Sequence, residues 1–157
     1  MLDVYTVSFF GHRQIIYSSE AQLKVYKLVK RLITEKEFVT FLLGRDGEFD
    51  QIAVSTIRRA KQEVRNDNSE IVWVLAYQKA EYINNIEFFN EYYDRVEICD
   101  KSARCHPKAT IQVRNQNMVD RSDLVACYVE RYTGGAFQTK AYAERIGKCV
   151  INLADTE

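Results

Sequence analysis

The sequence has little proline and little glycine, with one proline and six glycines among 157 residues. It also lacks internal repeats, low-complexity tracts and linker-like stretches. Its 22 basic and 22 acidic side chains leave a formal net charge of zero, which disfavours a globally basic nucleic-acid-binding protein but leaves room for a local basic patch. Because 46% of the residues are hydrophobic, the composition is too apolar for a disordered chain. We therefore expect a single globular domain over residues 1–157.

A long hydrophobic run is also missing, since no stretch of about 18 apolar residues occurs. We therefore expect no membrane-spanning helix. The first residues, MLDVYTVSFFGHRQ, lack the basic segment and the small-residue cleavage site of a secretory signal peptide. Both absences favour a cytoplasmic protein, in which the four cysteines are expected to be reduced thiols.

Standard motifs of metal and catalytic sites are absent as well. The spacing of Cys99, Cys105 and His106 fits no usual zinc pattern, and a second Cys/His pair is missing. There is no Ser/His/Asp, HExxH, Walker or GxGxxG signature. We interpret the cysteine segment as a solvated loop and predict neither a metal nor a cofactor.

Six short apolar runs predict β-strands, and several are apolar almost throughout, as in strands covered on both faces. They span Val4–Phe10, Phe38–Leu43, Ile71–Ala76, Arg95–Cys99, Leu124–Val129 and Cys149–Leu153. Segments of helical periodicity lie between them: Glu20–Thr34, Phe49–Val64, Ala136–Ile146 and, more weakly, Asn85–Tyr92 and Lys108–Arg121. Strands that alternate with helices predict a three-layer, Rossmann-like α/β domain with a mostly parallel sheet.

In such a fold, ligands bind beyond the carboxyl ends of the strands, where the strand order reverses. Four loops of this sequence belong to that edge and contain most of the unusual polar residues. They are residues 11–13 (GHR), 44–50 (GRDGEFD), 76–78 (AYQ) and 132–135 (YTGG). We expect them to line one ligand site.

Gly44 and Gly47 lie between a strand and a helix. Their spacing lets the backbone turn tightly and brings the first helical amides close to an anion. An ordinary turn, in which Asp46 or Asp50 caps the helix, is equally compatible with the residues.

Gly134 and Gly135 favour a phosphate-sized nest of backbone amides at a helix start, with the Thr139 hydroxyl about one turn further. A flexible turn that needs a positive φ is the alternative. His12 and Arg13 follow the first strand, where arginine can form a bidentate fork on phosphate and histidine can donate or accept. An exposed turn is the alternative there.

Arg114 and Asn115 lie on a predicted helix that ends near Asp120. These residues belong either to the ligand site or to a solvated helix. Tyr77 follows the third strand and would stack on a base, although such aromatics are more often part of a core.

Four segments, in this order, resemble the YpsA-like branch of the SLOG superfamily, which unites the Smf/DprA DNA-processing proteins with the LOG phosphoribohydrolases. They read VSFFGHRQI, FLLGRDGEFDQIA, VRNQNMVDRSDLVACYV and GGAFQTKAYAERIGKCVINL. Family members look like T-G-H-R-P after the first strand, S-G-x-x-x-G-x-D after the second, R-N-x-x-M-V-D before a later strand, and a glycine-pair loop that leads into a helix with a Y-A pair. The resemblance covers almost the whole chain.

The resemblance implies a Rossmann-like fold that binds a nucleotide or a nucleotide-derived ligand across these loops. The residues that match the motifs are Gly11, His12, Arg13, Gly44, Gly47, Asp50, Arg114, Asn115, Met118, Val119, Asp120, Gly134, Gly135, Tyr142 and Ala143, and Thr139 lies within the last motif. Arg45 and Glu48 stand where family loops are small and neutral, which implies a somewhat different ligand.

We predict a sensor or ligand-binding module for a nucleotide-like small molecule. The alternative is a hydrolase or transferase that acts on an N-glycosidic bond, as LOG enzymes do. Those enzymes carry P-G-G-x-G-T-x-x-E, and the position of the glutamate falls on Ala141 here. A DprA-like binder of single-stranded DNA is less favoured, because the chain has no basic run. The many aromatics and the amphipathic Glu20–Thr34 helix would support a homodimer.

Overall fold

The computed structural model describes residues 1–155, which form six β-strands and seven α-helices. The strands are β1 (Val4–Gly11), β2 (Phe38–Leu43), β3 (Ser69–Leu75), β4 (Arg95–Ile98), β5 (Leu124–Tyr128) and β6 (Cys149–Asn152). The helices are α1 (Ser18–Glu35), α2 (Glu48–Glu63), α3 (Ala80–Ile83), α4 (Ile86–Tyr92), α5 (Asp100–Ala103), α6 (Thr110–Asp120) and α7 (Gly135–Arg145), with 3-10 turns at Pro107–Ala109 and Leu153–Asp155. Every predicted strand and helix is present. The one-turn helices α3 and α5 were not expected, because four residues are too few to show a period.

The six strands form one sheet in the order β4-β3-β2-β1-β5-β6, and every neighbouring pair is parallel. From β1 the chain builds outward to β4 on one side and then returns to add β5 and β6 on the other. The strand order therefore reverses between β1 and β5. In that pair Gly11 lies opposite Tyr128, so both strands end at the same edge.

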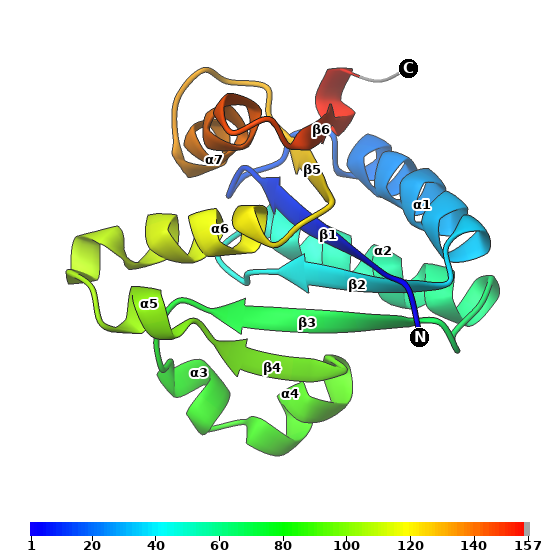
Figure 1. Ribbon diagram of the computed structural model, residues 1–157, viewed down its shortest axis with the longest axis horizontal. Helices are drawn as coiled ribbons and strands as arrows, with labels where there is room; N and C mark the ends of the chain where they lie inside the picture. The colour runs from blue at the N-terminus through cyan, green and yellow to red at the C-terminus, as the bar shows by residue number, and fades with distance from the viewer. Residues whose placement is uncertain (156–157) are drawn as a thin grey trace.

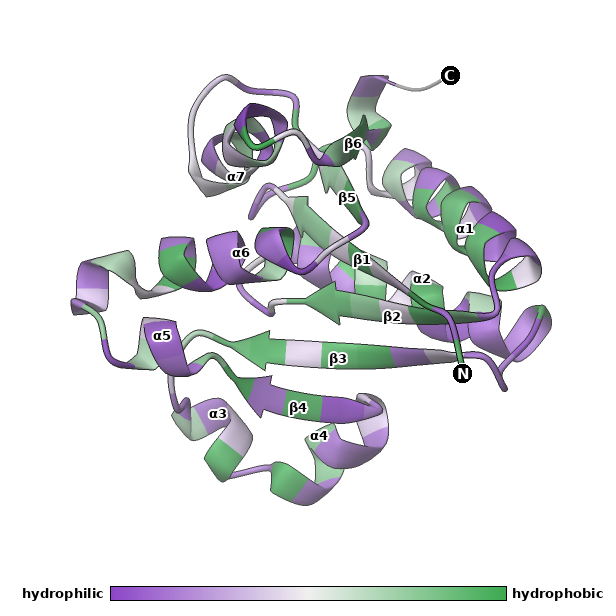
Figure 2. Cartoon of the chain, viewed as in Figure 1, coloured by the Kyte–Doolittle hydropathy of each residue, from purple (hydrophilic) through white to green (hydrophobic). Residues whose placement is uncertain are grey.

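Side chains of successive strand residues enter two different apolar layers. Phe9 and Phe41 pack with α1 and α2 on one face, whereas Phe10 and Leu42 pack with α6 and α7 on the other. Figure 1 shows α6 in front of the sheet and α2 behind it, and Figure 2 shows that the most hydrophobic residues gather on the strands. The structure thus confirms the predicted three-layer, Rossmann-like α/β domain, with a sheet that is parallel throughout.

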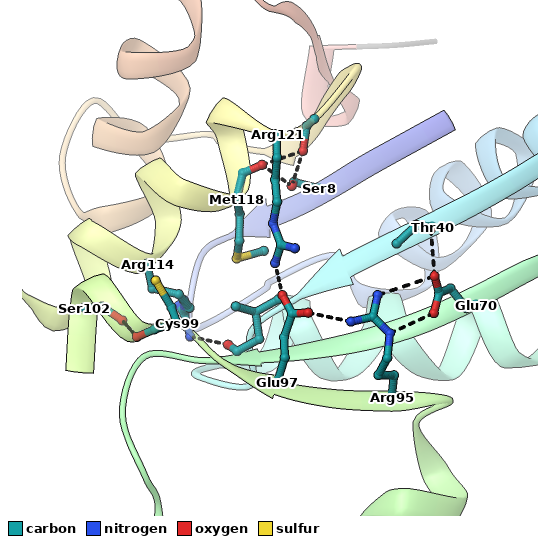
Figure 3. A network of polar contacts seen from close by, with 12 residues as sticks. Ser8, Thr40, Glu70, Arg95, Glu97, Cys99, Ser102, Arg114, Met118 and Arg121 are labelled. Carbon is teal, nitrogen blue, oxygen red and sulfur yellow. Dashed lines mark hydrogen bonds and ion pairs between the residues drawn. The ribbon is translucent and has the colours of Figure 1, made fainter. Parts of the chain in front are cut away.

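One corner of the sheet face next to α6 is polar rather than apolar. Near the amino ends of β2, β3 and β4, the Glu70 carboxylate accepts from Thr40 (3.0 Å) and pairs with Arg95 (3.1 Å). Arg95 also pairs with Glu97 (2.6 Å), which in turn contacts Arg121 at the end of α6 (Figure 3). These groups satisfy one another, so this corner needs no covering helix.

Among the described helices, none combines the length and the hydropathy that crossing a bilayer requires.

Candidate functional site

A cavity of about 550 Å³ lies where the strand order reverses, beyond the carboxyl ends of β1, β2 and β5. Its walls are the loop after β1, the loop after β2, the first turns of α6 and the loop between β5 and α7. Ten of the residues predicted from the sequence line it: Gly11, His12, Arg13, Gly44, Gly47, Asp50, Arg114, Asn115, Gly134 and Gly135. Segments that are far apart in the sequence therefore meet around one space.

Two other predicted residues face elsewhere. The Arg45 guanidinium turns to the α4 side of the sheet, where it lies 5.0 Å from the Phe89 ring centroid and donates to the Tyr93 hydroxyl (3.3 Å). Tyr77 lines a separate pocket of about 300 Å³, formed with Cys105 and Pro107. The structure thus does not bring Arg45 or Tyr77 to the cavity.

Two more predicted residues lie on helices but outside the cavity lining. Asp120 ends α6, and α6 runs from the carboxyl edge of the sheet back to the amino edge, where β5 begins. Its carboxylate accepts from the Tyr142 hydroxyl (2.6 Å), so it joins α6 to α7 away from the cavity. Thr139 is buried behind the first turn of α7, where its hydroxyl donates to the Gly135 carbonyl (2.9 Å).

The helix start after β2 is largely occupied by the protein itself. The first two amides of α2, those of Glu48 and Phe49, donate to the carbonyls of Arg13 (2.9 Å) and His12 (3.3 Å). The Asp46 amide donates to the Asp50 carboxylate (2.8 Å). Of the two interpretations open at this loop, the structure supports an ordinary turn, but neither Asp46 nor Asp50 caps the helix, since backbone carbonyls accept from its first amides.

The glycines of the first two loops are explained by packing. A Cβ on Gly11 would lie 2.2 Å from Cγ of Phe49, and one on Gly47 would lie 2.5 Å from Cα of Arg13. A Cβ on Gly44 would lie 2.8 Å from Oδ2 of Asp46. These glycines let chain segments approach each other, and a ligand is not needed to account for them.

Burial raises the pKa of the Asp50 carboxyl to about 6, against the stabilising amides of Asp46 and Gly47. Asp50, at the cavity wall, therefore keeps its proton to a higher pH than an ordinary carboxyl.

Arg114 is buried and bound on several sides. Its guanidinium donates to the Asp46 carboxylate (2.6 Å), to the Val74 carbonyl (3.3 Å) and to Oδ1 of Asn115 (2.9 Å). Figure 3 shows Arg114 reaching from α6 towards β3. Burial alone would raise the pKa of Asp46, but the Arg114 and Lys79 charges outweigh it and lower that pKa. Arg114 thus fastens α6 to the loop after β2 and is not an uncommitted phosphate ligand.

Asn115 and Thr139 extend this connection to α7. Nδ2 of Asn115 donates to the Thr139 hydroxyl (3.1 Å), which donates onward to the Gly135 carbonyl. Both side chains are buried. The first turn of α7 is therefore held against α6 by a hydrogen-bonded chain, and these residues position the helix start.

The helix start after β5 is open to the cavity. Within residues 1–155, nothing accepts a hydrogen bond from the amides of Gly135, Ala136 and Phe137. Gly134 has φ +96°, and a Cβ on it would meet no atom within 4 Å. Helix α7 begins without a side-chain cap. These amides and the partial positive charge of the helix terminus present an anion-binding surface.

The cavity walls also carry cations that pair with no described carboxylate. They are Arg13, Lys108 and Arg131, and all three are exposed. Sequence reasoning missed Lys108 and Arg131. Lys108 stands just before α6, and a helix that precedes a parallel strand must start at the carboxyl edge, so its position could have been inferred.

His12 completes the wall between β1 and β5. It is buried, and its Nε2 accepts from the amides of Glu130 (2.9 Å) and Arg131 (3.3 Å). Burial, and then the Arg131 charge, lower the pKa of His12. The lowered pKa and the two hydrogen bonds that Nε2 accepts both favour the neutral ring.

The four cysteines are free thiols, and two of them, Cys99 and Cys127, are buried. Among residues 1–155, no group of three or more His, Cys, Asp and Glu side chains is arranged to hold a metal ion.

No protein-family model matches the sequence, and no curated protein matches it. Solved structures do match its fold. One is the molybdenum cofactor carrier protein MCP from Chlamydomonas reinhardtii, with a TM-score of 0.60 and 12% identity over 94% of this chain and 75% of that one. Another is DNA processing protein A (DprA) from Streptococcus pneumoniae, with a TM-score of 0.67 and 14% identity over 94% of this chain. The match spans 49% of the DprA chain, and DprA is a member of the SLOG superfamily.

Proposed function

We propose that the cavity binds a nucleotide or a nucleotide-derived anion, and that the protein is a sensor or carrier of this ligand from the YpsA-like branch of the SLOG superfamily. The proposal rests on two groups of donors at one site. Three amides at the start of α7 have no acceptor in residues 1–155, and three nearby cations have no carboxylate partner there. Gly135, Ala136 and the three cations line one space of about 550 Å³, which suits a drug-sized molecule.

The arrangement favours phosphate because the amides and cations converge from separate loops. A phosphate between α7 and the Arg13 and Arg131 side chains would receive charge-assisted hydrogen bonds. The likeness to a cofactor carrier and to DprA supports ligand binding on this fold, although a shared fold does not fix chemistry.

Thermal-shift and calorimetric titration with nucleoside mono- and diphosphates, cyclic nucleotides and ADP-ribose tests the proposal. A ligand present at 100 times its Kd should stabilise the protein by about 2.7 kcal/mol. A single-stranded oligonucleotide in the same assay, at low and high salt, tests the DNA-binding alternative. If no nucleotide stabilises the protein at millimolar concentration, the proposal is wrong.

A substitution at Gly135 tests whether the nucleotide binds in this cavity. In Gly135→Asp the new carboxylate lies at the start of α7, where it favours the helix but repels a bound anion. We expect unchanged or higher thermal stability together with at least a tenfold loss of nucleotide affinity, or about 1.4 kcal/mol. Lys30→Ala, which removes an exposed cation on α1, is the matched control and should leave binding unchanged.

One observation favours a second candidate function, hydrolysis of the N-glycosidic bond of a nucleotide. Asp50 lines the cavity, and its pKa of about 6 suits a general acid or base near neutral pH. Against it, Ala141 at the position of the LOG glutamate is exposed and lies outside the cavity lining. Release of free base from nucleoside monophosphates, abolished in Asp50→Asn, would establish this function in place of simple carriage.

A further inference from the structure

His12 connects the cavity to the loop that follows β5. Residues 130–134 carry Arg131 and lead into the open start of α7. Among the residues that the structure describes, the His12 ring is the sole acceptor for amides of this loop, at 2.9 Å from Glu130 N and 3.3 Å from Arg131 N. The loop is otherwise exposed: Tyr132 is 88% accessible, and among the described residues its ring contacts only the Phe137 ring on α7, in an edge-to-face arrangement. One buried ring therefore holds the backbone at the start of this wall.

The two hydrogen bonds determine the tautomer of the ring. Nε2 accepts from two N–H groups, so it carries the lone pair, and the proton of the neutral ring must lie on Nδ1. Within residues 1–155, the shielded side-chain nitrogen and oxygen atoms that lack a partner are Oδ1 of Asn68 and Oγ of Ser69. Nδ1 of His12 is not among them, although no described residue accepts its proton. Nδ1–H is thus accessible on a ring that lines the cavity.

We infer that His12 has two roles, one for each ring nitrogen. Nε2 holds the loop between β5 and α7 in place, and Nδ1–H donates to an acceptor oxygen of the bound ligand. The inference rests on the proposed function. It specifies the ligand further, as a molecule that presents a phosphoryl, carbonyl or hydroxyl oxygen at the end of β1 while its anionic group meets the α7 amides. The same ring then keeps Arg131 and the helix start in their binding positions.

Two variants of similar shape distinguish the role of Nε2 as an acceptor from the role of Nδ1–H as a donor. In His12→Gln, the amide oxygen can reach the position of Nε2 and accept from the loop, but no donor remains at Nδ1. In His12→Asn, the amide NH₂ can replace the Nδ1–H donor, but the side chain is too short to reach the loop. His12→Ala removes both functions.

Hydrogen exchange of the Glu130 and Arg131 amides, measured by NMR on the ligand-free protein, reports on the loop. We expect protection to persist in His12→Gln and to fall about tenfold or more in His12→Asn and His12→Ala. The ¹⁵N shifts of the wild-type ring should show the tautomer protonated at Nδ1. Protection that survives in His12→Ala, or a ring protonated at Nε2, would overturn the inference.

Titration with AMP and ADP-ribose reports on the ligand. His12→Gln should bind about tenfold more weakly than wild type, because one hydrogen bond is lost. His12→Ala should bind more weakly still, by about a hundredfold if the two losses add. Wild-type affinity in His12→Gln would refute the Nδ1–H contact. If the wild-type protein binds neither compound, the proposed function fails for these ligands, whereas the exchange and tautomer measurements still decide the role of the ring in the loop.

Discussion

Two loops of this protein look alike in sequence and differ in their chemistry. The loop after β2 and the loop after β5 both place glycines before a helix, and both line the same cavity. At the first, carbonyls of His12 and Arg13 accept from the opening amides of α2, and the Asp50 carboxylate accepts from the loop backbone. At the second, the opening amides of α7 meet no acceptor in the described chain.

The difference shows what a glycine-rich loop before a helix indicates. Glycine is needed wherever the backbone approaches another atom closely, and that atom can belong to the protein or to a ligand. At Gly11, Gly44 and Gly47 the neighbouring atoms belong to the protein. At Gly134 the space is open, so the glycine is compatible with a close approach by a ligand. The accessibility of the amides therefore distinguishes a structural turn from a binding surface.

The largest loss of stability should come from breaking the ion pair between Arg114 and Asp46, which connects α6 to the loop after β2. Arg114→Met leaves the Asp46 carboxylate with only Lys79, at 3.5 Å, and removes donors from Val74 and Asn115. Because removal of one partner of a buried pair is costly, we expect the free energy of unfolding to fall by about 3 kcal/mol. Urea unfolding measures this change.

The double variant Arg114→Met with Asp46→Asn is the control, since it removes both charges together. It should recover part of the loss, giving a coupling energy above about 1 kcal/mol in the double-mutant cycle. Additive losses in the cycle would mean that the pair does not close the loop.

A pH-dependent effect should distinguish Asp50 from an ordinary exposed carboxylate. Its pKa is about 6 in the folded protein and 3.8 ordinarily, so between these values the folded state binds a proton that the unfolded state has released. The contribution of Asp50 to stability therefore falls as the pH rises from 3.8 to about 6 and is constant above. A shift of about two units corresponds to at most about 3 kcal/mol.

Asp50→Asn keeps an acceptor for the Asp46 amide but cannot ionise. The stability of this variant relative to wild type should therefore grow with pH across that window, as followed by urea unfolding at several pH values. Parallel curves for the two proteins would refute the elevated pKa.

The order of the strands and helices could be predicted from sequence because continuous apolar runs and helical periods are local signals. The edge at which the cavity lies followed from the fold class. What sequence could not reveal was the partner of each polar group. Arg114 and Arg13 look equivalent as phosphate ligands, yet Arg114 is paired with Asp46, 68 positions away in the chain, and Arg13 is exposed. Arg45 likewise stands beside Gly44 in sequence, but its guanidinium lies against Phe89 on the α4 side of the sheet and not in the cavity.

Alanine substitutions of one glycine in the loop after β2 and one in the loop after β5 should change the stability of the protein by different amounts. Gly47→Ala, in the loop after β2, forces a Cβ to within 2.5 Å of the backbone Cα of Arg13, and we expect a loss of about 2 kcal/mol from overpacking. Gly135→Ala meets only the end of the flexible Gln112 side chain, at 3.3 Å, so stability should change by less than about 0.5 kcal/mol. Thermal and urea unfolding of both variants provide the measurement, and similar losses would contradict the division into closed and open loops.

A small effect on stability, and none on binding, is expected at the far end of α6, which neither loop reaches. Tyr142→Phe removes the hydroxyl that donates to Asp120 (2.6 Å) at the exposed contact between α6 and α7. Because water can replace the lost partner of an exposed carboxylate, stability should fall by no more than about 1 kcal/mol. AMP binding should match that of wild type, since Asp120 and Tyr142 lie outside the cavity lining. A clear loss of affinity without a comparable loss of stability would show that the binding surface extends along α6 beyond Arg114, and the contrast between the two loops would then describe only part of the site.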